Sequence, residues 1–158
     1  MPLPLEVIRY RMRLDALFAK IDDLPAGDIE IQSHWARYLC VLVGGFIDFA
    51  VQEIHIEYSR AHGAAPTVLQ YVESRLRRTY NFNTEDILQL AGAFDPLIAL
   101  ELREELQGEP KDAIDSINNN RNLIAHGADV GITYVRIKRY YEEGQSVLQT
   151  LLAKYGLG

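Results

Sequence analysis

The residues best suited to chemistry lie in one short segment, Arg121-Asn122-Leu123-Ile124-Ala125-His126-Gly127. Arginine keeps its positive charge and presents five N–H donors, so it needs a partner wherever it is placed. Histidine titrates near neutral pH, so it can accept or release a proton during a reaction. On a helix, Asn122 and His126 are one turn apart, and Arg121 is long enough to reach the same space. The segment therefore predicts three polar groups that converge.

Arg121 interrupts an otherwise apolar stripe of the predicted helix over 110–126, which is formed by Ala113, Ile114, Ile117 and Ile124. A guanidinium cannot lose its charge, and an unpaired buried charge is costly. Asp48, which lies in a strongly apolar stretch, either pairs with Arg121 across the bundle or a dimer, or faces solvent. We favour the pairing, because a buried arginine needs a carboxylate.

The run Asn118–Asn122 is a poor choice for a helix interior, because asparagine side chains compete with the backbone for hydrogen bonds. Such local conflicts are frequent at functional sites. A purely structural interpretation also fits: the asparagines cap or fray a helix end, Arg121 extends to solvent, and His126 donates to the last carbonyls before the Gly127 stop.

The elements that must position these residues are all helices, and apolar spacing, caps and breakers predict an up-and-down bundle of six to seven helices in a single domain spanning 1–158. Asp28 is a plausible cap for a long central helix, and Thr84 for the fourth. Expected helices cover 5–23, 29–62, 66–80, a stretch from 84, 95–107, 110–127 and a last segment that closes near 155.

Within the central helix, the pair Gly44-Gly45 weakens helix propensity by about 1 kcal/mol per glycine relative to alanine. Close packing of another helix over this pair is the simplest explanation. Cys40, the single cysteine, lies in an apolar run and is expected to fill the core, as suits a reducing compartment.

The net charge of −6 argues against a protein that coats nucleic acid non-specifically, while local contacts to a few phosphates remain possible. Two basic clusters, Arg75/Arg77/Arg78 and Arg136/Lys138/Arg139, fit RNA binding and solvated helix faces equally well. No membrane span or secretory leader is recognisable, so we expect a cytoplasmic protein that does not associate with membranes.

The segment Arg121–His126 resembles the Arg-x4-6-His motif of the HEPN superfamily, with Asn directly after the arginine and a position near the end of a late helix. The earlier stretch Arg37–Asp48 resembles a glycine-aromatic-aliphatic-acid pattern in the second helix of the RiboL-PSP-HEPN branch. This places Asp48 at a recurring acidic position. Length, helix count and motif position agree with the family over essentially the whole chain.

The resemblance implies a metal-independent endoribonuclease that works as a homodimer, with two motif helices facing each other across a cleft. His126 would transfer the proton, Arg121 would hold the phosphate, and Asn122 would orient the phosphate or the histidine, with Asp48 and Asn118 in support. It also implies a prokaryotic defence, toxin or RNA-processing role, with an antitoxin or other partner protein. Some family members are non-catalytic binding modules, and this is the alternative.

Other side chains give weaker signals. His34, His55 and His62 lack the spacing of a metal site and are expected at the surface or at helix ends, so neither a metal nor a cofactor is predicted. Trp35 and the pair Tyr140-Tyr141 either stack on bases or, as is more usual for aromatic residues at helical spacing, pack in the core.

Overall fold

The computed structural model describes residues 3–24, 27 and 29–158, and this part of the chain is all-helical, with no strand. Its seven helices are α1 (Leu5–Asp22), α2 (Ile29–Ala61), α3 (Pro66–Leu76), α4 (Thr84–Phe94), α5 (Pro96–Glu105), α6 (Glu109–Ala125) and α7 (Tyr134–Lys154). The predicted all-α fold class is confirmed.

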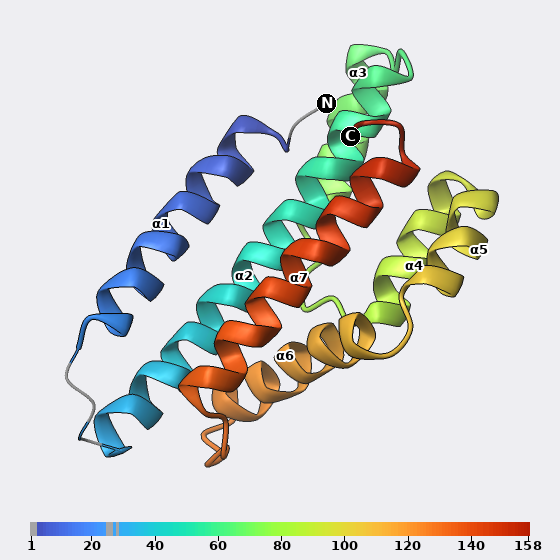
Figure 1. Ribbon diagram of the computed structural model, residues 1–158. Coiled ribbons are helices and arrows are strands. Elements are labelled where there is room, and N and C mark those ends of the chain that lie inside the picture. The colour runs from blue at the N-terminus through green and yellow to red at the C-terminus, as the bar shows by residue number, and fades with distance from the viewer. Residues whose placement is uncertain (1–2, 25–26, 28) are drawn as a thin grey trace.

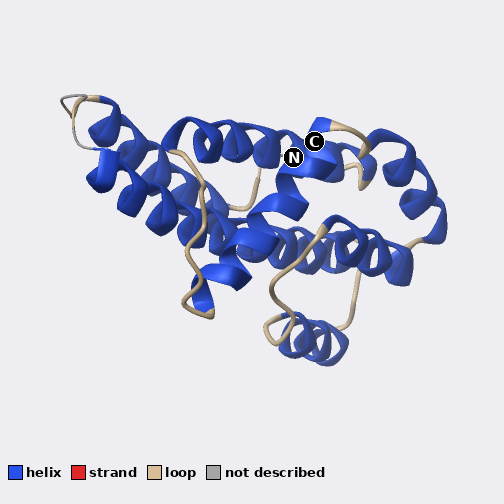
Figure 2. Ribbon diagram, turned by 90° about the horizontal axis from the view of Figure 1, so that it is seen from below, coloured by secondary structure: helices blue, strands red, loops and turns tan. Residues whose placement is uncertain are grey.

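The long helix α2 forms the centre of the bundle (Figure 1). α1 lies antiparallel along one side of it, whereas α7 lies beside it and runs in the same direction, as contacts of Phe46 with Tyr141 and of His55 with Tyr155 show. α6 crosses below this pair, and the short helices α4 and α5 pack at one end. Figure 2 shows from below that loops join the helices.

The core forms where α1, α2 and α7 meet. Phe18 stacks on Tyr141 with ring centroids 4.9 Å apart, and Phe46 meets the same tyrosine edge-on. α2 is long and apolar enough to cross a membrane by length and composition, but most of its apolar window is buried inside the bundle. Such burial is typical of a core helix.

Several helix ends differ from those predicted. α3 ends at Leu76 rather than near residue 80, and the N-cap of α4 is Asn83, not Thr84. The Asn83 side chain accepts from the Asp86 backbone N–H while the Asp86 carboxylate accepts from the Asn83 N–H, so a reciprocal capping box outcompetes the threonine. The proposed cap at Asp28 lies outside the described residues.

His55 corrects the expectation that the three histidines outside the motif are superficial. Its ring is fully buried: Nδ1 lies 2.7 Å from the Val51 carbonyl, and Nε2 lies 2.8 Å from the Tyr155 hydroxyl. A carbonyl only accepts, so Nδ1 carries the proton and Nε2 accepts from the tyrosine. Burial lowers the pKa of His55 to about 4, so the ring is neutral at pH 7.

Candidate functional site

The centre of the candidate site is an ion pair between α6 and α2. Arg121 Nη1 lies 2.5 Å from Asp48 Oδ2, so the predicted pairing of these two residues is confirmed. The side chain of Asp48 is 8% exposed and that of Arg121 is 22% exposed. The carboxylate is therefore enclosed by the bundle, while part of the arginine reaches the surface.

Asp48 also holds the loop that precedes α4. Its two carboxylate oxygens accept hydrogen bonds from the backbone N–H groups of Asn81 and Phe82, at 3.0 and 3.1 Å. Asn81 has a φ of +62°, a left-handed conformation that asparagine tolerates better than most residues. Its carbonyl accepts a 2.5 Å hydrogen bond from Asn118 Nδ2 of α6. One carboxylate thus joins α2, α6 and the loop.

Gly44 explains how Arg121 reaches Asp48. A Cβ atom at Gly44 would lie 2.8 Å from Arg121 Cδ, so the arginine stem crosses directly over the α2 backbone. The neighbouring Gly45 instead faces Tyr10 of α1, whose hydroxyl would lie 3.1 Å from an added Cβ. The expected close packing over this glycine pair is confirmed, with a different helix over each glycine.

Cys40 lies one turn before Gly44 and is buried, as expected for core filler. Its sulfur lies 3.8 Å from the Ile117 carbonyl of α6. Burial raises the pKa of this thiol to about 11, so it stays protonated and is a poor nucleophile at neutral pH.

Asn118, Asn122 and His126 follow one another at four-residue spacing along α6, beside Arg121. Asn122 donates to Asn118 Oδ1 over a long 3.4 Å contact, and both Asn122 and His126 are exposed. His126 is the C-cap residue, and Gly127 follows with a φ of +75°, which confirms the predicted glycine stop. Among the described residues, the imidazole of His126 has no hydrogen-bond or ion-pair partner.

The sequence profile of the RiboL-PSP-HEPN family matches residues 8–153, which is nearly the whole chain. The chain belongs to the RiboL-PSP-HEPN family. No curated protein and no solved structure matched it. In this RiboL-PSP-HEPN chain the motif arginine lies on α6, the motif histidine caps the C-terminal end of α6, and the acid of the second helix lies on α2.

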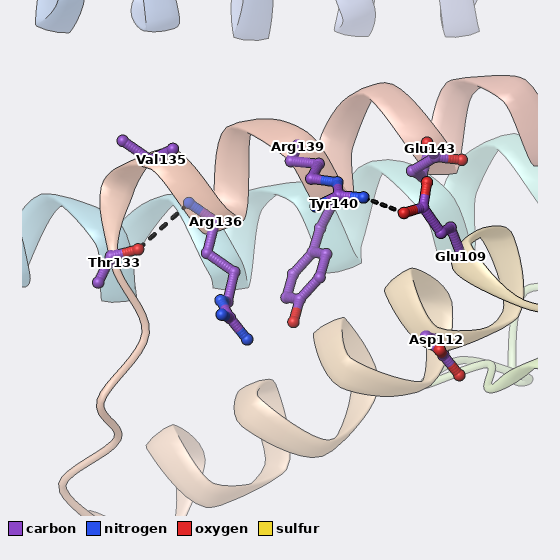
Figure 3. A pocket seen from close by; sticks show the side chains of 8 residues that line it. All are labelled: Glu109, Asp112, Thr133, Val135, Arg136, Arg139, Tyr140 and Glu143. Atoms are coloured by element: carbon purple, nitrogen blue, oxygen red, sulfur yellow. Dashed lines mark hydrogen bonds and ion pairs between the residues drawn. The ribbon is translucent and has the colours of Figure 1, made fainter.

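The side chains of the second basic cluster of this HEPN chain, Arg136/Lys138/Arg139, do not all lie together. Arg136 and Arg139 line a groove between α6 and α7 (Figure 3), whereas Lys138 points to α1, where its amino group lies 2.7 Å from Asp22. Lys138 therefore lies on a different face of α7 from Arg136 and Arg139, because it is about 200° around the helix from Arg136.

The aromatic candidates also separate. Tyr141 is buried in the core and its hydroxyl donates to Asp15, while the adjacent Tyr140 is half-buried and lines the groove. Trp35 packs edge-on against Tyr38 near the start of α2. Across residues 3–24, 27 and 29–158, no group of three or more metal-ligating side chains occurs.

The sequence did not predict the contribution of Asn81 and Phe82 to the site. Asn81 and Phe82 contribute only their backbone, so their types carry no direct signal of the contact. Asparagine's tolerance of a left-handed backbone is the one clue at residue 81. The sequence predicted close packing over Gly44. It did not predict that Arg121 is the side chain that crosses this glycine.

Proposed function

We propose that this chain is a metal-independent endoribonuclease that cleaves RNA through the substrate's own 2′-hydroxyl group. The observation that carries the proposal is the state of the two motif side chains. Arg121 is fixed by Asp48 yet partly exposed, and the imidazole of His126 is exposed and unpaired within the described chain. A fixed cation and a free proton carrier are the minimum that this reaction needs.

The chemistry assigns a role to each residue. The 2′-oxygen attacks the adjacent phosphorus, the bond to the 5′-oxygen breaks, and a 2′,3′-cyclic phosphate forms. One proton leaves the 2′-hydroxyl and one reaches the departing 5′-oxygen. His126 transfers one of these protons, as base or as acid, and Arg121 binds the charged phosphate. Asn122 orients the phosphate or the imidazole.

Arg121 can serve the bundle and a substrate together. Its guanidinium has five N–H donors, and the structure records one hydrogen bond to protein, from Nη1 to Asp48. Donors therefore remain for a phosphate. Asp48 and Asn118 act through Arg121 and the Asn81 loop, so they are positioning residues rather than groups that touch RNA.

We further propose that the working unit is a homodimer with a composite site. Both helices that form the ion pair also carry exposed apolar side chains, including Tyr38 and Val41 of α2 and Leu123 of α6. Burial of these side chains against a second copy would enclose two Arg121–His126 sets in one cleft. A cytoplasmic defence, toxin or RNA-processing role, with an antitoxin partner, belongs to the same proposal.

One observation favours the alternative, a non-catalytic helical module that binds a protein or RNA partner. The Arg121–Asp48 pair alone satisfies the need of a buried arginine for a carboxylate, without any substrate. In that case Asp48, Arg121 and Asn118 only hold α2, α6 and the loop together.

The test is RNA cleavage by the purified chain in EDTA, with product ends identified by mass spectrometry. We expect cleavage to persist without metal and to leave 2′,3′-cyclic phosphate or its hydrolysis product. His126→Ala should abolish cleavage, whereas His34→Ala, which removes another exposed histidine, should not change it. A strict need for Mg²⁺, or full activity in His126→Ala, would reject this mechanism and favour the binding module.

A further inference from the structure

A groove between α6 and α7 lies outside the ion-pair site. Its volume is about 400 Å³, which falls in the range of small-ligand sites. Figure 3 shows Arg136 and Tyr140 extending from α7 toward α6, and Glu109 and Asp112 on the α6 side. Thr133, at the start of α7, forms one end of the groove and caps the helix through its side-chain oxygen.

Two side chains that extend into the groove, Arg136 and Tyr140, have polar atoms that are free to bind a ligand. The guanidinium of Arg136 has no hydrogen-bond or ion-pair partner in the part of the chain that the structure describes, and neither has the Tyr140 hydroxyl. Arg139, by contrast, is paired with Glu109 across the groove. The groove therefore offers a free cation beside a half-buried aromatic ring, a combination that suits a phosphate and a base.

The other end of the groove is acidic. Glu109 is engaged by Arg139, while Asp112 and Glu143 line the groove with carboxylates, which accept hydrogen bonds and cannot donate them when ionised. A base that presents an exocyclic amino group fits such an edge, because that group donates. Uracil carries a carbonyl oxygen at the position where cytosine carries an amino group, so it fits less well.

We propose that this groove is a nucleotide subsite for single-stranded RNA. A base stacks on Tyr140, its phosphate pairs with Arg136, and the acidic edge favours bases with an amino group. The inference rests on the proposed action on RNA and deepens it, because the loop that begins at His126 leads directly to Thr133 at the groove. RNA held in the groove would continue toward the motif histidine.

The test separates binding from cleavage. Fluorescein-labelled 12-mers of 2′-fluoro-cytidine and 2′-fluoro-uridine lack the 2′-hydroxyl, and their binding is followed by fluorescence anisotropy in EDTA. We expect the cytidine oligomer to bind at least about threefold more tightly than the uridine oligomer. A tie between the two, or no binding of either, would overturn the inference, while the cleavage assay judges the catalytic proposal independently.

Matched variants localise the binding. Arg136→Gln and Lys138→Gln each remove one positive charge from α7, but only Arg136 faces the groove. Arg136→Gln should weaken binding about tenfold and Lys138→Gln less than twofold. Tyr140→Leu should weaken RNA binding about as much as Arg136→Gln does. Tyr140→Phe keeps the stacking face and should bind RNA normally. Equal losses in both glutamine variants would indicate non-specific charge attraction and contradict the subsite.

Discussion

Asp48 and Arg121 face each other across 73 residues of chain, and the same carboxylate that pairs with the guanidinium also accepts from two backbone N–H groups of the loop before α4. The pair is therefore part of a three-way joint between α2, α6 and that loop.

Asp48→Ala should destabilise the fold by about 3–5 kcal/mol, because it leaves a largely buried guanidinium and two backbone donors without their partner. Asp48→Asn should cost less, since its amide oxygen still accepts one of these hydrogen bonds. Urea denaturation followed by circular dichroism measures both. If Asp48→Ala unfolds at the same urea concentration as the unmodified protein, the joint contributes nothing to stability.

Gly44→Ala should displace Arg121, because the new methyl group would lie 2.8 Å from its Cδ atom. We expect RNA cleavage to fall at least about tenfold, although alanine itself favours the helix by about 1 kcal/mol.

Gly45→Ala is the matched control, because it has the same propensity gain but contacts Tyr10 instead of Arg121. The RNA cleavage rates of the two variants, each checked for folding, show whether the close contact between Gly44 and Arg121 matters for activity. Similar activity in both would show that the path of the arginine over Gly44 is unimportant.

The free energy of unfolding should decrease in mild acid, because His55 is protonated more readily in the unfolded state than in the folded state. Because burial lowers the pKa of this ring from 6.5 to about 4, the folded state keeps it neutral while the unfolded state takes up a proton. The free energy of unfolding is unaffected by this group above pH 6.5 and decreases as the pH falls from 6.5 toward 4. The total decrease is about 3 kcal/mol.

His55→Gln, which can still donate to Val51 and accept from Tyr155, removes this titration. Denaturation curves at pH 7 and pH 4.5 should therefore differ less in the variant than in the unmodified protein. An identical pH dependence in both would assign the acid sensitivity to other groups.

Substitution of 2′-deoxyribose at the cut position should block cleavage while leaving RNA binding intact, because only the nucleophile is missing. Arg121→Lys should be partly active, since an ammonium keeps the charge but loses the planar fork. Gel analysis of end-labelled oligonucleotides reports both effects. Cleavage at the deoxy position would require a different nucleophile from the one proposed.

Much of the site follows from sequence because its signals are local or obey charge balance. Arg121 on an apolar stripe required a carboxylate, and Asp48 was the acid placed in an apolar helix. Gly127 as the helix stop is a local signal of the same kind.

The missed features depend on contacts that no local pattern carries. His55 was expected at the surface or at a helix end because it lacks metal-site spacing, yet it is buried against Tyr155, which lies 100 residues along the chain. After α3 ends at Leu76, the chain leads into the Asn81 loop, whose backbone is held by Asp48 from another helix.

The parallel arrangement of α2 and α7 has a consequence for how the protein reaches this structure. A short turn cannot connect two helices that run in the same direction, so α3 to α6 must lie between them in the chain. Contacts such as Arg121–Asp48 therefore close long loops, whose entropy is lost before the contact forms. An α1–α2 hairpin can form early, but the motif arginine meets its carboxylate only when α6 has packed on α2. A partly folded chain thus carries every residue of the motif without the arrangement that we propose for catalysis.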